Sequence, residues 1–271
     1  IVAFVLATIV LVVPVILSSV RNEPIPQNPD QAITTGLGIG GFGFFLFAVV
    51  IAMNSISGEF ESGTIVPLLT KPVSRTMIFF GKLFASFLIL LTTYVILLCY
   101  LSIGSIVVYG PQNNLHLLPL SLIGSIISTF IWVSMILAIG TLSKSSMIAA
   151  LAAFGTWMGL GIASGIVSLT TEQAWVLNFL PGSGALGSLD SFGSLSTGTD
   201  SIASNLITIV LNPSANVTYY RMSFRPPYTR ILLYTEPLLN VLARSIGVAV
   251  AYILLFMFVS WFALKRAEVV E

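Results

Sequence analysis

The sequence predicts an all-α membrane protein with six transmembrane helices. Of the 271 residues, 56% are hydrophobic and only 8% are charged, with a mean hydropathy of +1.01. Soluble domains carry roughly 25% charged residues. The apolar residues form six continuous runs, each long enough for a helix to cross a bilayer, which takes about 20 residues. These runs do not alternate with polar residues, as the strands of a membrane β-barrel would.

The six predicted spans contain no Asp, Glu, Lys, Arg or His. They cover residues 1–20, 34–57, 83–109, 118–142, 147–170 and 245–264. Proton- and sodium-coupled transporters usually place ionisable groups inside the membrane, so this composition disfavours a proton relay. If the chain is a transporter, its source of energy therefore lies elsewhere.

The basic residues of the connections predict which side each connection faces. With residues 58–82 in the cytoplasm, the inside holds Lys71, Arg75, Lys82, Lys144, Lys265 and Arg266. The short outer loops then hold only Arg21. By the positive-inside rule, both ends of the chain face the cytoplasm and residues 171–244 form an extracellular loop. We expect one multi-pass domain, residues 1–271, in the cell membrane.

The extracellular loop has 74 residues and contains three short apolar segments, 174–180, 202–211 and 231–242. These segments either lie at the outer membrane interface, enter the bilayer as re-entrant pieces, or pack within the loop. The Gly- and Ser-rich centre, residues 182–201, has the composition of flexible chain. Asn216, in the motif Asn216-Val217-Thr218, is a candidate glycosylation site.

Motifs for catalysis and for direct nucleotide binding are missing. A single cysteine, Cys99, and a single histidine, His116, predict no metal site. The G-x-G-x-x-G match at residues 36–41 follows no strand, and Gly81-Lys82 lacks the upstream glycine of a phosphate-binding loop. The net charge of +1 gives no basic excess for nucleic acid. We predict a non-catalytic protein that binds no cofactor itself, so that any ATP that drives it is bound by another chain.

Four glycines in the fifth span form two G-x-x-x-G pairs, Gly155 with Gly159 and Gly161 with Gly165. Each pair lies on one helix face, where another backbone can approach closely. That neighbour belongs to the same chain or to a second chain, and both fit equally well. A third interpretation is local plasticity, because glycine weakens a helix by roughly 1 kcal/mol relative to alanine.

Residues 58–82 are the most charged connection. Glu59 and Glu61 begin the segment, residues 64–69 are largely apolar, and a basic turn follows at 71–75. Ser74 is placed to cap the helix of the third span. This combination suits docking to a partner protein, and it suits equally an interfacial loop whose cations reach the lipid headgroups.

The same segment resembles the type-2 ABC transporter permeases, in particular the branch of the permease of nitrous-oxide-reductase maturation. Members carry a pattern close to E-x-E-x-G-T-[IL]-x-x-L-L-[ST]-x-P-[VL]-[SG]-R-x-x-[IL]-x-x-G-K. The matching positions are Glu59, Glu61, Gly63, Thr64, Ile65, Leu68, Leu69, Thr70, Pro72, Val73, Ser74, Arg75, Ile78, Gly81 and Lys82. The six-span layout and the charged end extend the resemblance over most of the chain, although the 171–244 loop is longer than in the plain family.

The resemblance implies a cytoplasmic coupling helix, about Glu59–Leu69, seated in a groove of a separate ATP-binding subunit that holds ATP and Mg. Glu59 and Glu61 would contact that subunit or hold the helix, and Arg75 and Lys82 would anchor it at the membrane surface. Two permease chains, identical or homologous, would pair with two ATP-binding subunits in the lipid bilayer.

We therefore expect the permease subunit of an ABC exporter that moves an amphipathic or hydrophobic cargo such as a lipid, drug or peptide. Two alternatives stay open. In one, the subunit acts as an ATP-driven mechanotransmitter on an outer partner docked on residues 171–244. In the other, the chain is an ATP-independent channel or anchor. A partner-binding face in the loop would favour the first, and purification without an ATPase would favour the second.

Overall fold

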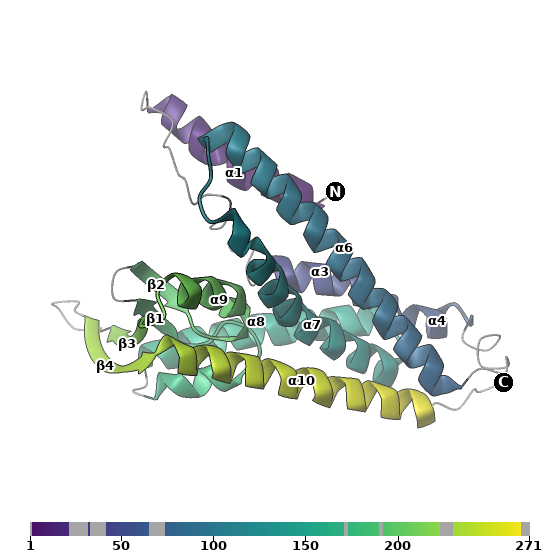
Figure 1. Ribbon diagram of the computed structural model, residues 1–271. Helices are drawn as coiled ribbons and strands as arrows, with labels where there is room; N and C mark the ends of the chain where they lie inside the picture. Colours follow the sequence, from purple (N-terminus) through teal and green to yellow (C-terminus); the bar gives the residue numbers. More distant parts are fainter. Residues whose placement is uncertain are drawn as a thin grey trace.

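The computed structural model describes residues 2–21, 32, 42–64, 74–170, 173–189, 192–222 and 230–266. Helices make up most of the described chain, and a small sheet lies at one end of the helix bundle (Figure 1). The α-helices are α1 (Val2–Val20), α3 (Phe42–Ala52), α4 (Ser57–Glu61), α6 (Arg75–Tyr109), α7 (Leu118–Ser143), α8 (Ser146–Thr170), α9 (Ile202–Leu211) and α10 (Leu238–Arg266). We call the two ends of the bundle the sheet end and the α4 end.

Four helical stretches within the described residues are long and apolar enough to cross a membrane: Arg75–Tyr109, Leu115–Ser143, Ser146–Ser168 and Leu238–Arg266. They correspond to the last four predicted spans, and all four begin earlier than predicted, most clearly α6 at Arg75 and α10 at Leu238. α6 begins at Arg75 because the Ser74 hydroxyl caps it, accepting a hydrogen bond of 3.2 Å from the N–H of Met77. The predicted cap is thus confirmed.

The first two predicted spans are represented by shorter helices. α1 has 19 residues and packs against the second half of α6, where the Tyr109 hydroxyl donates to the Leu11 carbonyl at 2.8 Å. α3 covers only the 11 residues Phe42–Ala52 of the predicted span 34–57, and residues 33–41 lie outside the described residues. The count of six spans therefore stays a prediction.

α7 is the central helix, in contact with α3, α6, α8, α9 and α10. Its middle is buried on every side, since all residues from Ile131 to Ala138 are buried, including Trp132. The Phe45 ring of α3 lies edge-on to Trp132 at 5.6 Å and stacks on Trp157 of α8 at 5.4 Å. α6, α8 and α10 instead expose large apolar side chains, as helices in contact with lipid do.

The fold is mostly helical, but the all-α prediction was too strict. The predicted loop contains a four-stranded antiparallel sheet in the order β2-β1-β3-β4. The strands are β1 (Leu186–Leu189), β2 (Phe192–Ser196), β3 (Asn216–Met222) and β4 (Arg230–Pro237). Three short 3-10 helices complete the described elements: η1 (Leu115–Leu117), η2 (Ala174–Phe179) and η3 (Thr199–Ser201).

The Gly-rich centre of the loop is folded, so the expectation of flexible chain over 182–201 was wrong for most of it. Its glycines allow backbones to approach closely. A Cβ on Gly184 would lie 2.6 Å from the Gly198 nitrogen, and one on Gly187 would lie 2.7 Å from a methyl carbon of Val217. Glycine at these positions thus serves packing rather than freedom of the chain.

α9 occupies the predicted apolar segment 202–211 and lies against the first half of α7. A Cβ on Gly124 would lie 2.4 Å from the Ala203 Cα, so only glycine permits this approach. The Ser128 hydroxyl donates to the Thr199 carbonyl at 2.6 Å. None of the three interpretations of this segment named packing against a spanning helix, which is what the structure shows.

The same packing brings an acidic residue to the helix bundle. Asp200 of η3 accepts a hydrogen bond from Ser183, and its carboxylate and the buried Trp132 ring both lie next to Gly182. The other carboxylate oxygen of Asp200 is buried without a hydrogen-bond partner among the described residues. The predicted spans lack ionisable groups, but the fold places one from the loop beside the middle of α7.

Candidate coupling site at the α4 end

α4 is a single helical turn that follows α3 after a break at residues 53–56. It lies against α7 because Gly140 leaves room for it: a Cβ on Gly140 would lie 3.0 Å from the Ser57 hydroxyl oxygen. The turn ends at Ser62 and at Gly63, whose φ of +70° is a left-handed conformation that favours glycine. Within the described residues, α4 therefore ends before the predicted coupling helix, about Glu59–Leu69, would end. Residues 65–69 lie outside the described residues.

Glu59 connects α4 to α6. Its carboxylate forms an ion pair with the ammonium group of Lys82. The side chains are 22% and 32% exposed, respectively, so the pair is partly shielded from water. Lys82 lies two turns into α6, so a displacement of α4 acts on α6 through this contact.

Glu61 connects α4 to the start of α8. One carboxylate oxygen accepts hydrogen bonds of 2.8 Å from the Ser145 hydroxyl and from the backbone N–H of Ser146, and the other accepts from the Ser146 hydroxyl. The hydrogen bonds from Ser146 and Ser145 hold the pKa of Glu61 below its usual range. The carboxylate also lies at the positive end of the α8 dipole, which favours an anion.

Phe60 and Lys144 add a third contact, with the turn between α7 and α8. The Phe60 ring packs against the core cluster that contains Trp132 and Ile136, and the Lys144 ammonium lies 5.8 Å from the ring centroid. Lys144 itself has a φ of +54°, the left-handed conformation that ends α7. α4 thus contacts α6, α7 and α8 through three successive residues.

Arg75 connects the first turn of α6 to the last turn of α10. Its guanidinium donates to the Leu264 carbonyl at 3.4 Å and to the Lys265 carbonyl at 3.1 Å. The Trp261 indole also donates to the Thr76 hydroxyl at 3.3 Å. Through α6, the contacts of α4 therefore extend to α10.

Of the nine predicted coupling residues, six lie in described parts of the chain: Glu59, Glu61, Gly63, Thr64, Arg75 and Lys82. Leu68, Leu69 and Pro72 lie outside them. The described six do not form one cluster, since Glu59 and Lys82 pair on one side of α4 while Arg75 reaches α10. Thr64 only exchanges a hydrogen bond with Ser62.

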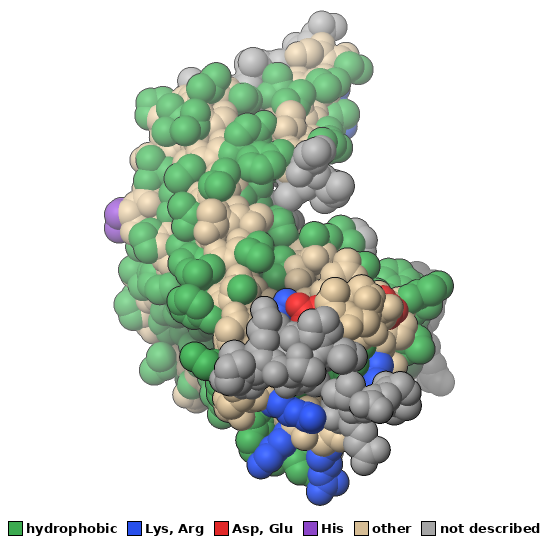
Figure 2. Space-filling view, turned by 90° about the vertical axis from the view of Figure 1, so that its right-hand side faces the viewer, with side chains coloured by type: hydrophobic (Ala, Val, Ile, Leu, Met, Phe, Trp, Pro, Cys, Tyr) green, Lys and Arg blue, Asp and Glu red, His purple; other side chains and the backbone are tan. Residues whose placement is uncertain are grey.

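Sequence reasoning missed Ser145 and Ser146, which hold Glu61, and the contact of Lys144 with Phe60. The signal was available in the four-residue link Ser143-Lys144-Ser145-Ser146, whose hydroxyls suit a helix N-terminus. Figure 2, which looks onto the α4 end, shows Lys and Arg side chains gathered in the lower part of this face, whereas hydrophobic side chains are spread over its upper part.

At the opposite end, a second polar network joins the sheet to α10. Arg244 of α10 forms a two-point ion pair with Glu236 of β4, at 3.1 and 2.9 Å. It also donates to the Tyr219 hydroxyl of β3 at 3.3 Å, and this hydroxyl accepts a hydrogen bond of 3.0 Å from the Asn178 amide. The folded outer segment is thus bonded directly to a long apolar helix.

The described residues contain no group of three or more His, Cys, Asp or Glu side chains that could hold a metal ion. The four long apolar helices have the length and composition of membrane spans, as expected of a multi-pass membrane protein.

Comparison with known families places the chain within that class. The profile of the family described as "ABC-2 family transporter protein" matches residues 11–269, so the chain belongs to the ABC-2 transporter family. Members of this family are membrane permease subunits of ABC transporters, generally non-catalytic, that typically work with an ATP-binding subunit. The match shows the family but does not distinguish the branch of the permease of nitrous-oxide-reductase maturation. No curated protein matches the sequence.

Proposed function

We propose that this protein is the permease of an ABC exporter and that α4, with the segment that follows it, is the docking site of a separate ATP-binding subunit. The α4 end then faces the cytoplasm and the sheet end faces outward, in agreement with the basic residues at the α4 end. The ATP-binding subunit holds ATP and Mg, and both chain termini lie on its side of the membrane.

The observation that carries this proposal is the set of contacts that Glu59, Phe60 and Glu61 make. These three consecutive residues contact α6, the end of α7 and the start of α8, respectively. A subunit that displaces α4 therefore acts on three long helices at once. Glu59 and Glu61 are predicted either to contact the ATP-binding subunit or to hold the helix. Their bonds within the chain support the second role, because both carboxylates already have partners.

Pairing of two permease chains is supported by the exposed face of α8. A Cβ on Gly155, Gly159, Gly161 or Gly165 would meet no described atom within 4 Å, so these glycines do not serve packing within the described chain. Only 6% of the most apolar part of α8 is buried. A second copy seated on this helix would use the close approach that the glycines permit.

The proposed cargo is amphipathic or hydrophobic. α6 carries no charged side chain from Leu83 to its end at Tyr109. α7 and α8 carry none within their bounds. A pathway lined by such helices suits a lipid, drug or peptide better than a free ion.

Affinity purification of the tagged chain in mild detergent tests the proposal. We expect a stoichiometric ATP-binding subunit to copurify with the wild type and to be lost from the variant with Glu59→Lys and Glu61→Lys. The double variant Glu59→Lys/Lys82→Glu serves as control, because it restores the ion pair with Glu61 intact and should recover part of the complex. Purification without any ATP-binding subunit under several mild conditions would contradict the proposal and favour a channel or anchor.

A mechanotransmitter is a second candidate, supported by the folded outer segment. The ion pair of Glu236 with Arg244 joins this segment to α10, whose other end contacts Arg75. Movement at the α4 end would thus reach an outer partner through one helix. The ATPase activity of the complex in liposomes distinguishes the two functions. Stimulation by a cargo indicates an exporter, and stimulation by an outer protein indicates a mechanotransmitter.

A further inference from the structure

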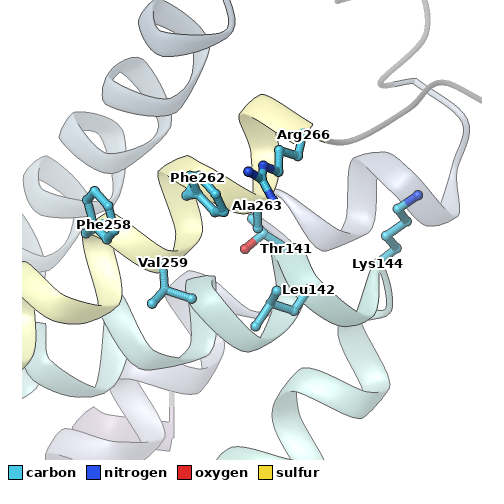
Figure 3. Close-up of a pocket in the computed structure, with 8 residues that line it drawn as sticks. All are labelled: Thr141, Leu142, Lys144, Phe258, Val259, Phe262, Ala263 and Arg266. Atoms are coloured by element: carbon cyan, nitrogen blue, oxygen red, sulfur yellow. The ribbon is translucent and has the colours of Figure 1, made fainter.

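A groove between the last turns of α7 and α10 combines apolar walls with two cations at one end (Figure 3). It has a volume of about 460 Å³. Leu142, Phe258 and Phe262 supply apolar surface, and they are 64%, 60% and 40% exposed. Lys144 and Arg266 supply the charge, and Thr141 also lines the groove.

One face of α10 builds most of the groove. Phe258, Phe262 and Arg266 follow one another at a spacing of four residues, so they lie along a single helix face. The two phenyl rings stack at 6.1 Å with an angle of 17° between their planes, and the Arg266 guanidinium lies 4.1 Å from the Phe262 centroid. The result is an apolar strip that ends in a positive charge.

Within the part of the chain that the structure describes, the two cations of the groove have no acidic partner. Among the described residues, neither Lys144 nor Arg266 has a carboxylate oxygen within 4 Å, and no Asp or Glu lines the groove. The described carboxylates of α4 are already occupied, since Glu59 pairs with Lys82 and Glu61 accepts hydrogen bonds from Ser145 and Ser146. Each cation lies over an aromatic ring, Lys144 over Phe60 and Arg266 over Phe262.

We infer that this groove binds an anionic phospholipid, with the phosphate between Lys144 and Arg266 and an acyl chain along Leu142, Phe258 and Phe262. The charge is complementary, and guanidinium and ammonium groups are the usual phosphate donors of proteins. On the proposed orientation the groove lies at the level of the inner-leaflet headgroups, where anionic lipids are available. The inference does not depend on an ATP-binding partner or on a cargo.

Native mass spectrometry of the purified full-length chain tests it with two probes of equal acyl length, dioleoyl phosphatidylglycerol and dioleoyl phosphatidylcholine. We expect the wild type to retain phosphatidylglycerol preferentially. The variant Lys144→Gln/Arg266→Gln should bind it about 25-fold more weakly, because each surface cation contributes about fivefold to the attraction of an anionic lipid. Binding of phosphatidylcholine should change little.

Lys265→Gln is the matched control, since Lys265 lies in the same turn of α10 but over Trp261 and outside the groove. Lys144→Arg/Arg266→Lys should keep the preference, and circular dichroism checks that every variant is helical. Equal retention of the two lipids, an equal loss in Lys265→Gln, or displacement of the lipid by inorganic phosphate would overturn the inference. Phe258→Ser should weaken both lipids, because it removes apolar wall and no charge.

Discussion

Glu61 on α4 accepts a hydrogen bond of 2.8 Å from the backbone N–H of Ser146, the first residue of α8. A residue predicted as part of a docking surface therefore also caps one of the long helices of its own chain. This relationship means that variants of Glu61 report on the internal connection as well as on a partner, and the two effects need separate measurements.

Glu61→Gln should loosen the first turn of α8. The amide side chain keeps one acceptor but loses the charge that favours the helix N-terminus. We expect faster hydrogen exchange at the amides of residues 146–149 in the isolated chain, with no comparable change in Ser62→Ala, whose hydroxyl bonds only within its own turn and to Thr64. Unchanged exchange in Glu61→Gln would show that the cap has no role in holding α8.

The contribution of Glu61 should depend on pH. Because its folded-state pKa is lowered, its stabilising effect is present above the unfolded-state pKa, about 4.3, and is lost as the pH falls through the folded-state value. The difference in hydrogen exchange between wild type and Glu61→Gln should therefore be full at pH 6–7 and shrink in acid. A difference that grows toward low pH would contradict this sign.

The ion pair of Glu59 with Lys82 predicts a charge-reversal rescue. Glu59→Lys places two cations together and should lower the free energy of unfolding by about 1 kcal/mol, the upper range for a partly exposed pair. Adding Lys82→Glu should restore most of the loss. Thermal unfolding of the four proteins of this double-mutant cycle measures the coupling, and strictly additive effects would mean that the pair contributes nothing.

Two glycine-to-alanine variants separate buried from open positions. In Gly124→Ala the new Cβ would lie 2.4 Å from the Ala203 Cα, so α9 must move from α7, at a cost of roughly 1–3 kcal/mol. Gly155→Ala meets no described atom and should gain up to about 1 kcal/mol of helix propensity in the isolated chain. Comparable melting temperatures for the two variants would be inconsistent with the packing of α9.

Loss of Arg244 should release the sheet from α10. Arg244→Ala removes a two-point ion pair and leaves Glu236, whose side chain is 19% exposed, without its cation. We expect destabilisation of about 2–3 kcal/mol, the range of hydrogen bonds to charged groups. Thermal unfolding measures this, and Arg266→Ala, an exposed cation at the other end of α10, should have a much smaller effect.

Glycosylation of Asn216 stays a prediction. The residue begins β3 and is half-buried, and its backbone is in register with Pro237 of β4. A sugar could be attached to Asn216 before the sheet has folded, or afterwards if the side chain is accessible. In a host that glycosylates the chain, Asn216→Gln should remove the shift in electrophoretic mobility that the sugar causes. A shift that persists in the variant would place the sugar elsewhere.

The prediction of long apolar helices needed only local information. A run of uncharged residues of sufficient length must form its backbone hydrogen bonds internally in lipid, so helices α6, α7, α8 and α10 follow from composition and length. The cap at Ser74 follows from its position before the helix. The segment around Glu59 could likewise be singled out, because its motif is contiguous in the chain.

Contacts between distant segments could not be predicted in this way. Ser146 follows Glu61 by 85 residues, and no local pattern records that the two meet. The same holds for the approach of Gly124 to Ala203 and for the arrival of Asp200 beside Trp132. In the loop, glycines that resemble flexible chain by composition prove to be the positions where two backbones touch, as at Gly184 and Gly198.

The sequence by itself thus determined that the main helices suit a lipid bilayer and how long they are. The reason is that the free energy of transferring a helix to lipid depends on its apolar composition and length. Only the tertiary structure decided which helix is central, how the outer segment folds into a sheet, and which charges meet at the α4 end. These features depend on close approach of backbones and on pairs such as Glu59 with Lys82, and both are properties of the packed chain rather than of any segment of it.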